Sequence, residues 1–400
     1  SGTLHTYVDG ELASEIVFGD GVTGVATGDL LVGPAGRGEG LGAGDVAVVA
    51  LDEVAISNVW RTDAEIARAA GRPVPTPEPQ LANQALLALV DLPAGLDSDE
   101  LLVPATNPPS EGAVELGRLL FFDPRLSRDG TISCATCHDP AHAWTDGNVT
   151  GVGIEGRVGG RNTPTIFNRA MSNGQFWDGR ASTMEMQSVM PIVSFTEMDN
   201  TEQVVLAFLE SVPGYVERFE AEYGTGPSVE GIENAIASFE RAQLTGNSPV
   251  DRFEDGDLGA LNESEQRGRI LFHTKARCSG CHAGSNFTDE AFHSTGVVVQ
   301  SLADFGRAAR SGRWRDLFAF KTPTLRNVAE TAPYFHDGSS PTLADVVERY
   351  NRGSVVDMHD WDIRPLALTG QEQADLVAFL EALSDPNATS AEAPELPPAP

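Results

Sequence analysis

Cys134-Ala135-Thr136-Cys137-His138 is the stretch of this chain that decides its fold, and Cys278-Ser279-Gly280-Cys281-His282 repeats it. Together the two stretches use all four cysteines of the chain. In a Cys-x-x-Cys-His motif the two thiols bond covalently to the vinyl groups of a haem, and the histidine that follows ligates the iron. We therefore predict two covalently bound haem c groups, with His138 and His282 as proximal iron ligands, and a redox function.

Paired cysteines also occur in zinc sites, in redox-active dithiols and in disulfides. Zinc sites and dithiols do not require a histidine directly after the second cysteine. Two disulfides in a secreted protein would leave His138 and His282 unexplained. The two complete copies of the motif therefore favour haem attachment.

The composition indicates a globular chain of about two or three domains, in which 41% of the residues are hydrophobic. No run of about 18 apolar residues occurs, so we predict no membrane span. The formal net charge of −31 argues against nucleic acid as a partner. The same charge could steer a basic electron donor such as a small cytochrome, or could serve solubility alone.

Haem attachment to this motif takes place outside the cytoplasm, which indicates a periplasmic or other extracytoplasmic location. The printed sequence starts without a signal peptide. We therefore expect an export signal upstream of Ser1.

Residues 1–70 alternate strand-like runs with Gly-Asp turns. The segment resembles the C-terminal half of a laminin-G/concanavalin-type jelly roll, with Tyr7-Val8-Asp9-Gly10 and Leu51-Asp52-Glu53-Val54 as matching stretches. A complete sandwich needs roughly twice as many residues, so we expect a partial β jelly-roll segment. Residues 71–110 are rich in proline and predict a linker that carries one short helix near Leu81–Val90.

The chain that follows contains an internal repeat. Gly117-Arg118-Leu119-Leu120-Phe121 precedes the first haem motif, and Gly268-Arg269-Ile270-Leu271-Phe272 precedes the second. Thr163-Pro164-Thr165 recurs 159 positions later (322 − 163) as Thr322-Pro323-Thr324. Apolar residues at helical spacing accompany both copies.

The repeat predicts a mainly α fold with two cytochrome c-like haem domains. We place the N-terminal haem domain at residues 111–250 and the C-terminal haem domain at residues 251–384. Residues 385–400 are rich in proline, alanine and serine and predict a disordered tail.

Four stretches inside the repeat carry a family resemblance. They are Leu119-Leu120-Phe121-Phe122-Asp123-Pro124-Arg125-Leu126-Ser127, Arg161-Asn162-Thr163-Pro164-Thr165, Phe176-Trp177-Asp178-Gly179-Arg180 and Phe320-Lys321-Thr322-Pro323-Thr324-Leu325-Arg326-Asn327. From about Glu111 to Ser384 the chain resembles the bacterial di-haem cytochrome c peroxidases of the family that includes MauG. The resemblance implies a peroxidatic N-terminal haem, where hydrogen peroxide is the substrate, and an electron-transferring C-terminal haem.

Three functional hypotheses follow. In the first, a small redox protein, either a cytochrome c or a cupredoxin, supplies electrons and hydrogen peroxide is reduced to water. In the second, a MauG-like enzyme uses peroxide-derived high-valent haems to oxidise side chains of a partner protein. The third is a non-enzymatic electron-transfer cytochrome with an adhesive jelly-roll module. Family members often dimerise, so a homodimer is a further expectation.

The resemblance implies catalytic roles for three side chains. In the family a Gln and a Glu ten residues apart line the peroxide side of the N-terminal haem, and here these are Gln187 and Glu197. Gln187 would orient peroxide, and Glu197 would move a proton from the near to the far peroxide oxygen, so that water leaves. Trp177 matches a family tryptophan that relays electrons between the haems, with core packing as its alternative role.

Most members also carry a distal histidine on the N-terminal haem that must leave before peroxide binds. Here the corresponding loop, residues 151–160, contains no histidine, and the family position falls near Ile154. His142 is the nearest substitute, but it lies only four residues after His138 and is interpreted as a surface or packing residue. We expect an open N-terminal haem that needs no reductive activation.

The sixth ligand of the second haem is a methionine in most members, fourteen residues after the His of a Tyr/Phe-His-Asp-Gly motif. Counting from His336 gives Tyr350, and MauG-like proteins carry an axial tyrosine there. A phenolate stabilises ferric and higher iron states, so we predict a low-potential His/Tyr haem. Met358 is the competing ligand, and an ordinary helix aromatic is the alternative for Tyr350. The repeat places Pro191, which cannot ligate, at the equivalent position of the first domain.

The resemblance further implies a calcium ion at the domain boundary. Its protein ligands would be Asn162 and the backbone carbonyls of Thr331 and Pro333, with waters completing the oxygen shell. Residue spacing alone gives no sign of this site.

Overall fold

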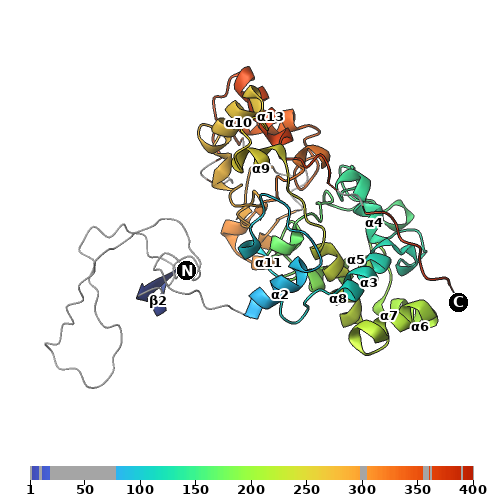
Figure 1. Cartoon of the computed structure of the whole chain (residues 1–400). Helices are drawn as coiled ribbons and strands as arrows, with labels where there is room; N and C mark the ends of the chain where they lie inside the picture. The colour runs from blue at the N-terminus through green and yellow to red at the C-terminus, as the bar shows by residue number, and fades with distance from the viewer. Residues whose placement is uncertain are drawn as a thin grey trace. The chain divides into compact units, whose positions relative to one another are not determined.

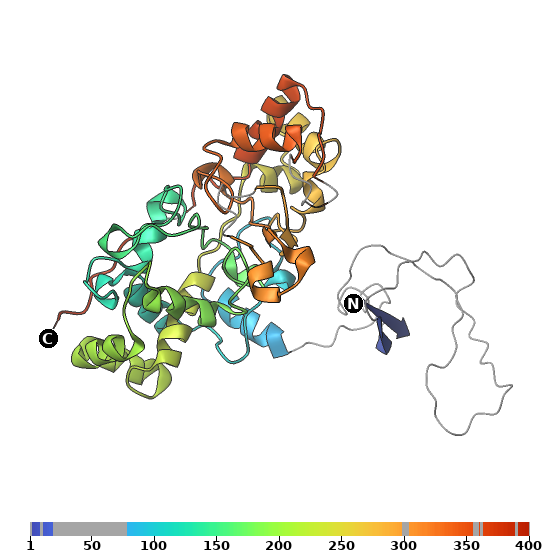
Figure 2. The same ribbon diagram turned by 180° about the vertical axis from the view of Figure 1, so that it is seen from behind.

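The computed structural model is drawn in Figure 1 and, from behind, in Figure 2. It describes residues 2–8, 11–18, 78–297, 304–354, 360, 363–388 and 391–399. The chain divides into two units, Ser1–Pro77 and Glu78–Pro400. The second unit contains both haem motifs.

One β-hairpin is described in the first unit. Strands β1 (Gly2–Val8) and β2 (Glu11–Phe18) pair antiparallel, so that Gly2 lies opposite Phe18. The rest of the jelly-roll segment expected at residues 1–70, and the first residues of the expected linker, lie outside the described residues.

The second unit is mainly helical, as the sequence predicts. Its α-helices are α2 (Glu78–Leu87), α3 (Glu111–Phe122), α4 (Cys134–Cys137), α5 (Met184–Val193), α6 (Glu202–Ser211), α7 (Pro213–Tyr223), α8 (Val229–Arg241), α9 (Pro249–Glu254), α10 (Glu263–His273), α11 (Ala308–Ser311), α12 (Leu343–Arg352) and α13 (Gly370–Glu381). Two short strands, β3 (Phe292–His293) and β4 (Phe320–Lys321), pair antiparallel. Among the described residues, no helix is both long and apolar enough to cross a membrane.

Helices α3 and α8 form the centre of the N-terminal haem domain. The side chain of Ser110 caps α3 by accepting a hydrogen bond from the amide of Ala113. The two helices approach most closely at Gly117, where a Cβ atom would lie 1.9 Å from the carbonyl oxygen of Ala235. Only glycine permits this approach, so the Gly-Arg-Leu-Leu-Phe stretch sets how the helices cross.

Helices α10 and α13 repeat this arrangement in the C-terminal haem domain. A Cβ atom at Gly268 would lie 1.9 Å from the carbonyl oxygen of Asp375. The rings of Phe272 and Phe379 have centroids 5.1 Å apart, and the corresponding pair in the N-terminal domain has the same separation. The two haem domains therefore share one helical scaffold.

The loops of the two domains repeat as well. Asn168 and Asn327 adopt left-handed backbone conformations with φ of 56° and 55°. Phe176 and Phe335, also 159 positions apart (335 − 176), have φ of 65° and 69°. Each domain has a buried apolar core of its own. The predicted internal repeat is thus present in the backbone and in the packing.

The segment expected to be a proline-rich linker is part of the compact unit from α2 onward. Helix α2 occupies the place of the short helix expected near Leu81–Val90. Buried apolar side chains join this segment to the N-terminal haem domain: Ala82, Leu86, Leu101, Val103, Ala170 and Met171. The amide of Leu102 also donates to the carbonyl of Ala170 at 2.7 Å. Burial of these apolar groups holds residues 82–103 against the domain instead of leaving them as a free spacer.

The C-terminal tail also differs from the disordered segment that the sequence predicts. Its described residues 391–399 form no helix or strand, yet they run along the N-terminal haem domain (Figure 1). Arg118 donates to the carbonyl of Glu392 at 3.2 Å, and Arg125 donates to the carbonyl of Pro397 at 3.0 Å. Leu396 packs against the core of that domain.

Candidate functional site

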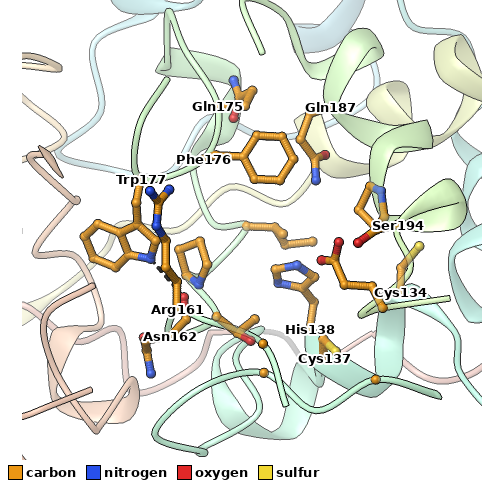
Figure 3. Close-up of a pocket in the computed structure, with 18 of the residues that line it drawn as sticks. Cys134, Cys137, His138, Arg161, Asn162, Gln175, Phe176, Trp177, Gln187 and Ser194 are labelled. Atoms are coloured by element: carbon orange, nitrogen blue, oxygen red, sulfur yellow. Dashed lines mark hydrogen bonds between the residues drawn. The ribbon is translucent and has the colours of Figure 1, made fainter. Parts of the chain in front are cut away.

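A cavity of about 600 Å³ lies beside the first haem motif (Figure 3). Seven residues predicted to have a catalytic or ligand role line it: Cys134, Cys137, His138, Asn162, Trp177, Gln187 and Glu197. They come from α4, from α5 and the turn after it, and from two loops. The structure therefore brings together the residues that the sequence predicts for haem attachment, proton transfer and electron relay.

The two histidines predicted as proximal iron ligands share the same kind of backbone contact. Nδ1 of His138 lies 3.1 Å from the carbonyl oxygen of Trp144, and Nδ1 of His282 lies 2.9 Å from that of Phe287. A proton on Nδ1 that is donated to this carbonyl leaves Nε2 free to bind a metal. Burial lowers the pKa of both histidines, which keeps them neutral, as ligation requires.

All four cysteines are free thiols. Burial raises the pKa of Cys137 and of Cys278 to about 12. The cysteines of each motif are not joined as a disulfide, and the histidine beside them presents its Nε2. Each motif therefore fits a covalently bound haem c.

Gln187 and Glu197 enter the cavity from neighbouring positions on one wall. Thr183 caps α5, which carries Gln187, by accepting a hydrogen bond from the amide of Met186. Glu197 follows α5 in a turn closed by its amide donating to the carbonyl of Ser194 at 3.1 Å. Both side chains are half-buried. In Figure 3 the side chains of Gln187 and His138 point into the cavity from different sides.

The loop of residues 151–160 holds the backbone that carries Glu197. Ile154 is fully buried, and its amide donates to the carbonyl of Glu197 at 2.8 Å. Arg157 donates to the carbonyl of Phe195 at 2.6 Å and to the carboxylate of Asp199 at 2.7 Å. Ile154 is not among the residues that line the cavity. Near the position that the resemblance gives for a distal histidine, the chain therefore has an aliphatic residue that is buried outside the cavity lining.

Two further residues are candidates for a second iron ligand at the first haem motif, and neither fits that role. Pro191 lines the cavity and has no atom that could ligate iron. His142 is exposed, and its Nδ1 lies 2.9 Å from the carboxylate of Asp139. His142 is thus a surface residue, as interpreted from the sequence.

Tyr350 lies beside the second haem motif. Burial raises the pKa of its phenol, and the neighbouring sulfur atoms of Cys278 and Cys281 raise it further. Its ring packs against Phe335 with centroids 5.9 Å apart. A ferric ion would have to supply the positive charge that stabilises a phenolate at this buried position. Met358, the competing ligand, lies outside the described residues.

Trp177 contacts both haem domains. Its indole Nε1 donates to the carbonyl of Asn162 at 2.8 Å, and its own carbonyl accepts from the amide of Lys321 at 2.8 Å. Its ring is 6.5 Å from that of His336, which stacks on Phe320 at 3.5 Å. An aromatic path therefore leads from the first cavity into the C-terminal domain.

Asn162, one of the residues implied in calcium binding, joins two loops. The amide of Asn162 donates to the carbonyl of His336 at 2.8 Å, and its side-chain nitrogen donates to the carbonyl of Asn148 at 2.9 Å. Within the described part of the chain, no donor reaches Oδ1 of Asn162 or the carbonyls of Thr331 and Pro333. These oxygens have the chemistry of a calcium shell.

An ion-pair cluster that no sequence motif indicates lies on the cavity wall. Arg161 lies 3.1 Å from Asp178 and 2.8 Å from Asp304, and Arg180 lies 3.1 Å from Asp178. Arg161 and Arg180 both line the cavity and could pair with haem carboxylates. Three of these residues stand in the family stretches, whereas only the fold brings Asp304 to them.

Two other buried groups on the cavity wall were also missed. Nζ of Lys321 lies 2.7 Å from Oγ of Ser172 and 2.8 Å from Glu290, and burial lowers its pKa to about 7. Glu240 is buried on the same wall, and burial raises its pKa to about 7. In the sequence Lys321 stands in one of the family stretches, and the chain has just one other lysine, Lys275.

The fold and the site define a di-haem c-type peroxidase. The family described as di-haem cytochrome c peroxidase matches residues 111–259. The chain is 38% identical over 283 residues to the methylamine utilization protein MauG of Methylorubrum extorquens, which covers 70% of this chain and 80% of that protein. The chain therefore belongs to the di-haem cytochrome c peroxidase and MauG family.

Two further relatives show the same family. The cytochrome c551 peroxidase of Nitrosomonas europaea is 36% identical over 286 residues, with 70% of this chain and 83% of that protein covered. A crystal structure of a MauG-like protein associated with microbial copper homeostasis has a TM-score of 0.70 and 31% identity, with 74% of this chain and 96% of that chain covered. This chain is accordingly a peroxidase-type oxidoreductase that carries two haem c groups.

Proposed function

We propose that this protein reduces hydrogen peroxide to water in the periplasm, at the first haem site, with electrons that arrive from a small redox protein through the second. Each turnover converts one peroxide, two electrons and two protons into two waters. The observation that carries this proposal is that Gln187, Glu197 and His138 line one cavity. Pro191 lines it too, at the position that the internal repeat makes equivalent to Tyr350 of the second domain.

When bound, haem c supplies the iron that accepts the oxidising equivalents of peroxide. The side-chain amide of Gln187 donates a hydrogen bond to peroxide and orients it. The carboxylate of Glu197 takes a proton from the near peroxide oxygen and gives it to the far oxygen, which leaves as water. The loop of residues 151–160 holds the backbone of Glu197 in place during this proton transfer.

The second domain serves electron transfer in this proposal. Tyr350 would ligate the iron of a haem held at the second motif, and its position beside Cys278 and Cys281 supports this role. Trp177 carries electrons between the domains, which its contacts with Asn162 and His336 support. Asn162, Thr331 and Pro333 would hold a calcium ion, which would tie together the loops on either side of this path.

A MauG-like function is the second candidate. In it the oxidising equivalents are used on side chains of a partner protein, and the electrons come from that partner. The 38% identity with the methylamine utilization protein and the position of Tyr350 favour this alternative. The two candidates share the chemistry at Glu197 and differ only in the source of electrons.

The proposal is tested with the Glu197→Gln variant of the holoprotein. Loss of a positioned general acid and base typically costs about 10²- to 10⁴-fold in rate. We expect a fall of that size in the second-order rate constant of the reaction with peroxide, measured by stopped-flow absorbance. The Glu210→Gln variant, at an exposed glutamate on α6, is the control. An unchanged rate constant in Glu197→Gln would refute the proposed mechanism.

A further inference from the structure

Arg313, Trp314 and Arg315 form an exposed tip, which we call the arginine–tryptophan tip. The side chain of Trp314 is 80% exposed, more than any other large hydrophobic residue in the described part of the chain. Among the described residues no carboxylate lies within ion-pair distance of Arg313, and Arg315 reaches only Asp316, at 3.9 Å. On a chain of net charge −31, the tip is a cationic and apolar surface that meets no carboxylate of the described residues except Asp316.

The tip is carried by a segment that is fastened to the protein. The amide of Arg307, just before α11, donates to the carbonyl of Ala319 at 2.8 Å. The guanidinium of Arg307 donates to the carbonyls of Asp178 and Gly179, both at 2.9 Å. The exposure of Trp314 is therefore a property of an anchored turn and not of a free end.

A recess of about 430 Å³ lies beside the tip. Its lining consists of Ala291, Phe292, Arg307, Ser311, Arg313 and Asp316. The guanidinium of Arg307 covers the ring of Phe292 at 4.4 Å, so one wall is an arginine stacked on an aromatic ring. Asp316 is the only acidic residue in this lining. An incoming carboxylate side chain could reach Arg313 here.

We propose that the arginine–tryptophan tip and this recess form the docking surface for the acidic face of the small redox protein that delivers electrons. This inference rests on the proposed function, because it names the surface through which that partner acts. Tryptophan and arginine are the residue types that dominate the binding energy of protein interfaces. Two arginines around an exposed tryptophan therefore favour a partner with carboxylates around an apolar centre.

The net negative charge of the chain does not prevent such a contact. At physiological ionic strength the Debye length is about 8 Å, so charges far from the tip are screened. The arginines of the tip therefore determine the electrostatic interaction with a docked partner. A small protein touches only this surface. An anionic membrane would face a much larger part of the acidic molecule, which makes it the less favourable occupant.

The position of the tip also suits electron delivery. Arg307 binds the carbonyls of Asp178 and Gly179, which directly follow Trp177 in the chain. The amide of Lys321, in strand β4, donates to the carbonyl of Trp177 at 2.8 Å. A donor docked at the tip would therefore sit on the segments that hold the proposed relay residue.

The test uses the holoprotein with two redox proteins as probes, a plant plastocyanin with an acidic patch and a basic mitochondrial cytochrome c. Binding of each oxidised probe is measured by calorimetry without peroxide, so the result does not depend on turnover. We expect Trp314→Ala and the double variant Arg313→Glu/Arg315→Glu to weaken plastocyanin binding about tenfold or more. Arg218→Glu, at an exposed arginine on α7, should bind plastocyanin like the unchanged protein.

The peroxide reaction of each variant, followed without a protein donor, checks its fold and should be unchanged. The proposal is overturned if the tip variants bind plastocyanin normally, or if the unchanged protein prefers the basic cytochrome. It is also overturned if the tip binds vesicles of anionic phospholipid while plastocyanin does not bind. Failure of the unchanged holoprotein to react with peroxide would instead refute the proposed function, whatever the binding result.

Discussion

The backbone amide of Ile154 donates a hydrogen bond of 2.8 Å to the carbonyl oxygen of Glu197. This bond joins the loop without a distal histidine to the acid proposed to move the peroxide proton. Gly153 lies so close to the same segment that a Cβ atom there would be 2.2 Å from the carbonyl oxygen of Thr196. The loop thus contacts the backbone that carries Glu197 and supplies no histidine as an iron ligand.

Gly153→Ala is expected to slow the reaction with peroxide. The new methyl group must displace the backbone of Thr196 and Glu197, and misplacing a catalytic group by about 1 Å can cost about 100-fold. The measurement is the second-order rate constant of the holoprotein by stopped flow. Gly226→Ala, where nothing lies within 4 Å of the added methyl, is the control. Equal rates in the two variants would show that the loop does not position Glu197.

Tyr350→Phe is expected to open the second haem. Removal of the phenol oxygen takes away the proposed sixth ligand, so the second ferric signal should change from low-spin to high-spin. Tyr350→Met should keep it low-spin and raise its reduction potential, because a thioether favours ferrous iron. Both are measured by electron paramagnetic resonance and redox titration. In Tyr334→Phe, whose hydroxyl binds the carbonyl of Val328, the spectrum should not change. An unaltered spectrum in Tyr350→Phe would exclude Tyr350 as the ligand.

Glu240 is expected to make the stability depend on pH. Burial raises its pKa from an ordinary 4.5 to about 7, so the folded state holds this proton more tightly than the unfolded state. Its contribution to stability is therefore complete below pH 4.5 and is lost as the pH rises through 7. A shift of this size corresponds to roughly 3 kcal/mol.

Thermal unfolding of Glu240→Gln tests this expectation. Between about pH 5 and about pH 8 the Tm of the unchanged protein should fall more than that of the variant. The exposed Glu230, on the same helix, provides the control Glu230→Gln. Parallel Tm curves for the unchanged protein and Glu240→Gln would contradict this account of the buried acid.

Removal of calcium is expected to loosen the loops around Trp177. Asn162 offers its side-chain oxygen to the proposed ion and accepts the indole hydrogen bond of Trp177 through its backbone. Chelation should therefore lower Tm and slow electron exchange between the haems, and added calcium should restore both. In Asn162→Ala the response to chelation should be much smaller. If chelation changes neither Tm nor exchange in the unchanged protein, no calcium acts at this position.

Much of this architecture is predictable from local sequence signals. The Cys-x-x-Cys-His motifs give the haem attachment, because that chemistry needs these residues in this order. The repeated Gly-Arg stretch gives two helical domains, since the closely packed helix pairs need Gly117 and Gly268 at their crossings. The separation of Gln187 and Glu197 could be matched to the family because both lie within one short segment of α5 and its following turn.

Other features depend on contacts between residues far apart in the chain. Nothing near Asp304 in the sequence indicates that it pairs with Arg161. The tail is rich in proline, alanine and serine, a composition typical of disorder, yet arginines of the N-terminal domain bind carbonyls of its described residues. The exposure of Trp314 is likewise invisible in the sequence, where a tryptophan is normally read as a core residue.

The central claim is that the first haem is open and the second is closed by Tyr350. It is tested most directly by low-temperature electron paramagnetic resonance of the oxidised holoprotein, before and after one equivalent of peroxide. We expect one high-spin and one low-spin ferric signal, and both should disappear with peroxide. Two low-spin signals that peroxide does not change would contradict the claim, because an unrecognised ligand would then close the first haem.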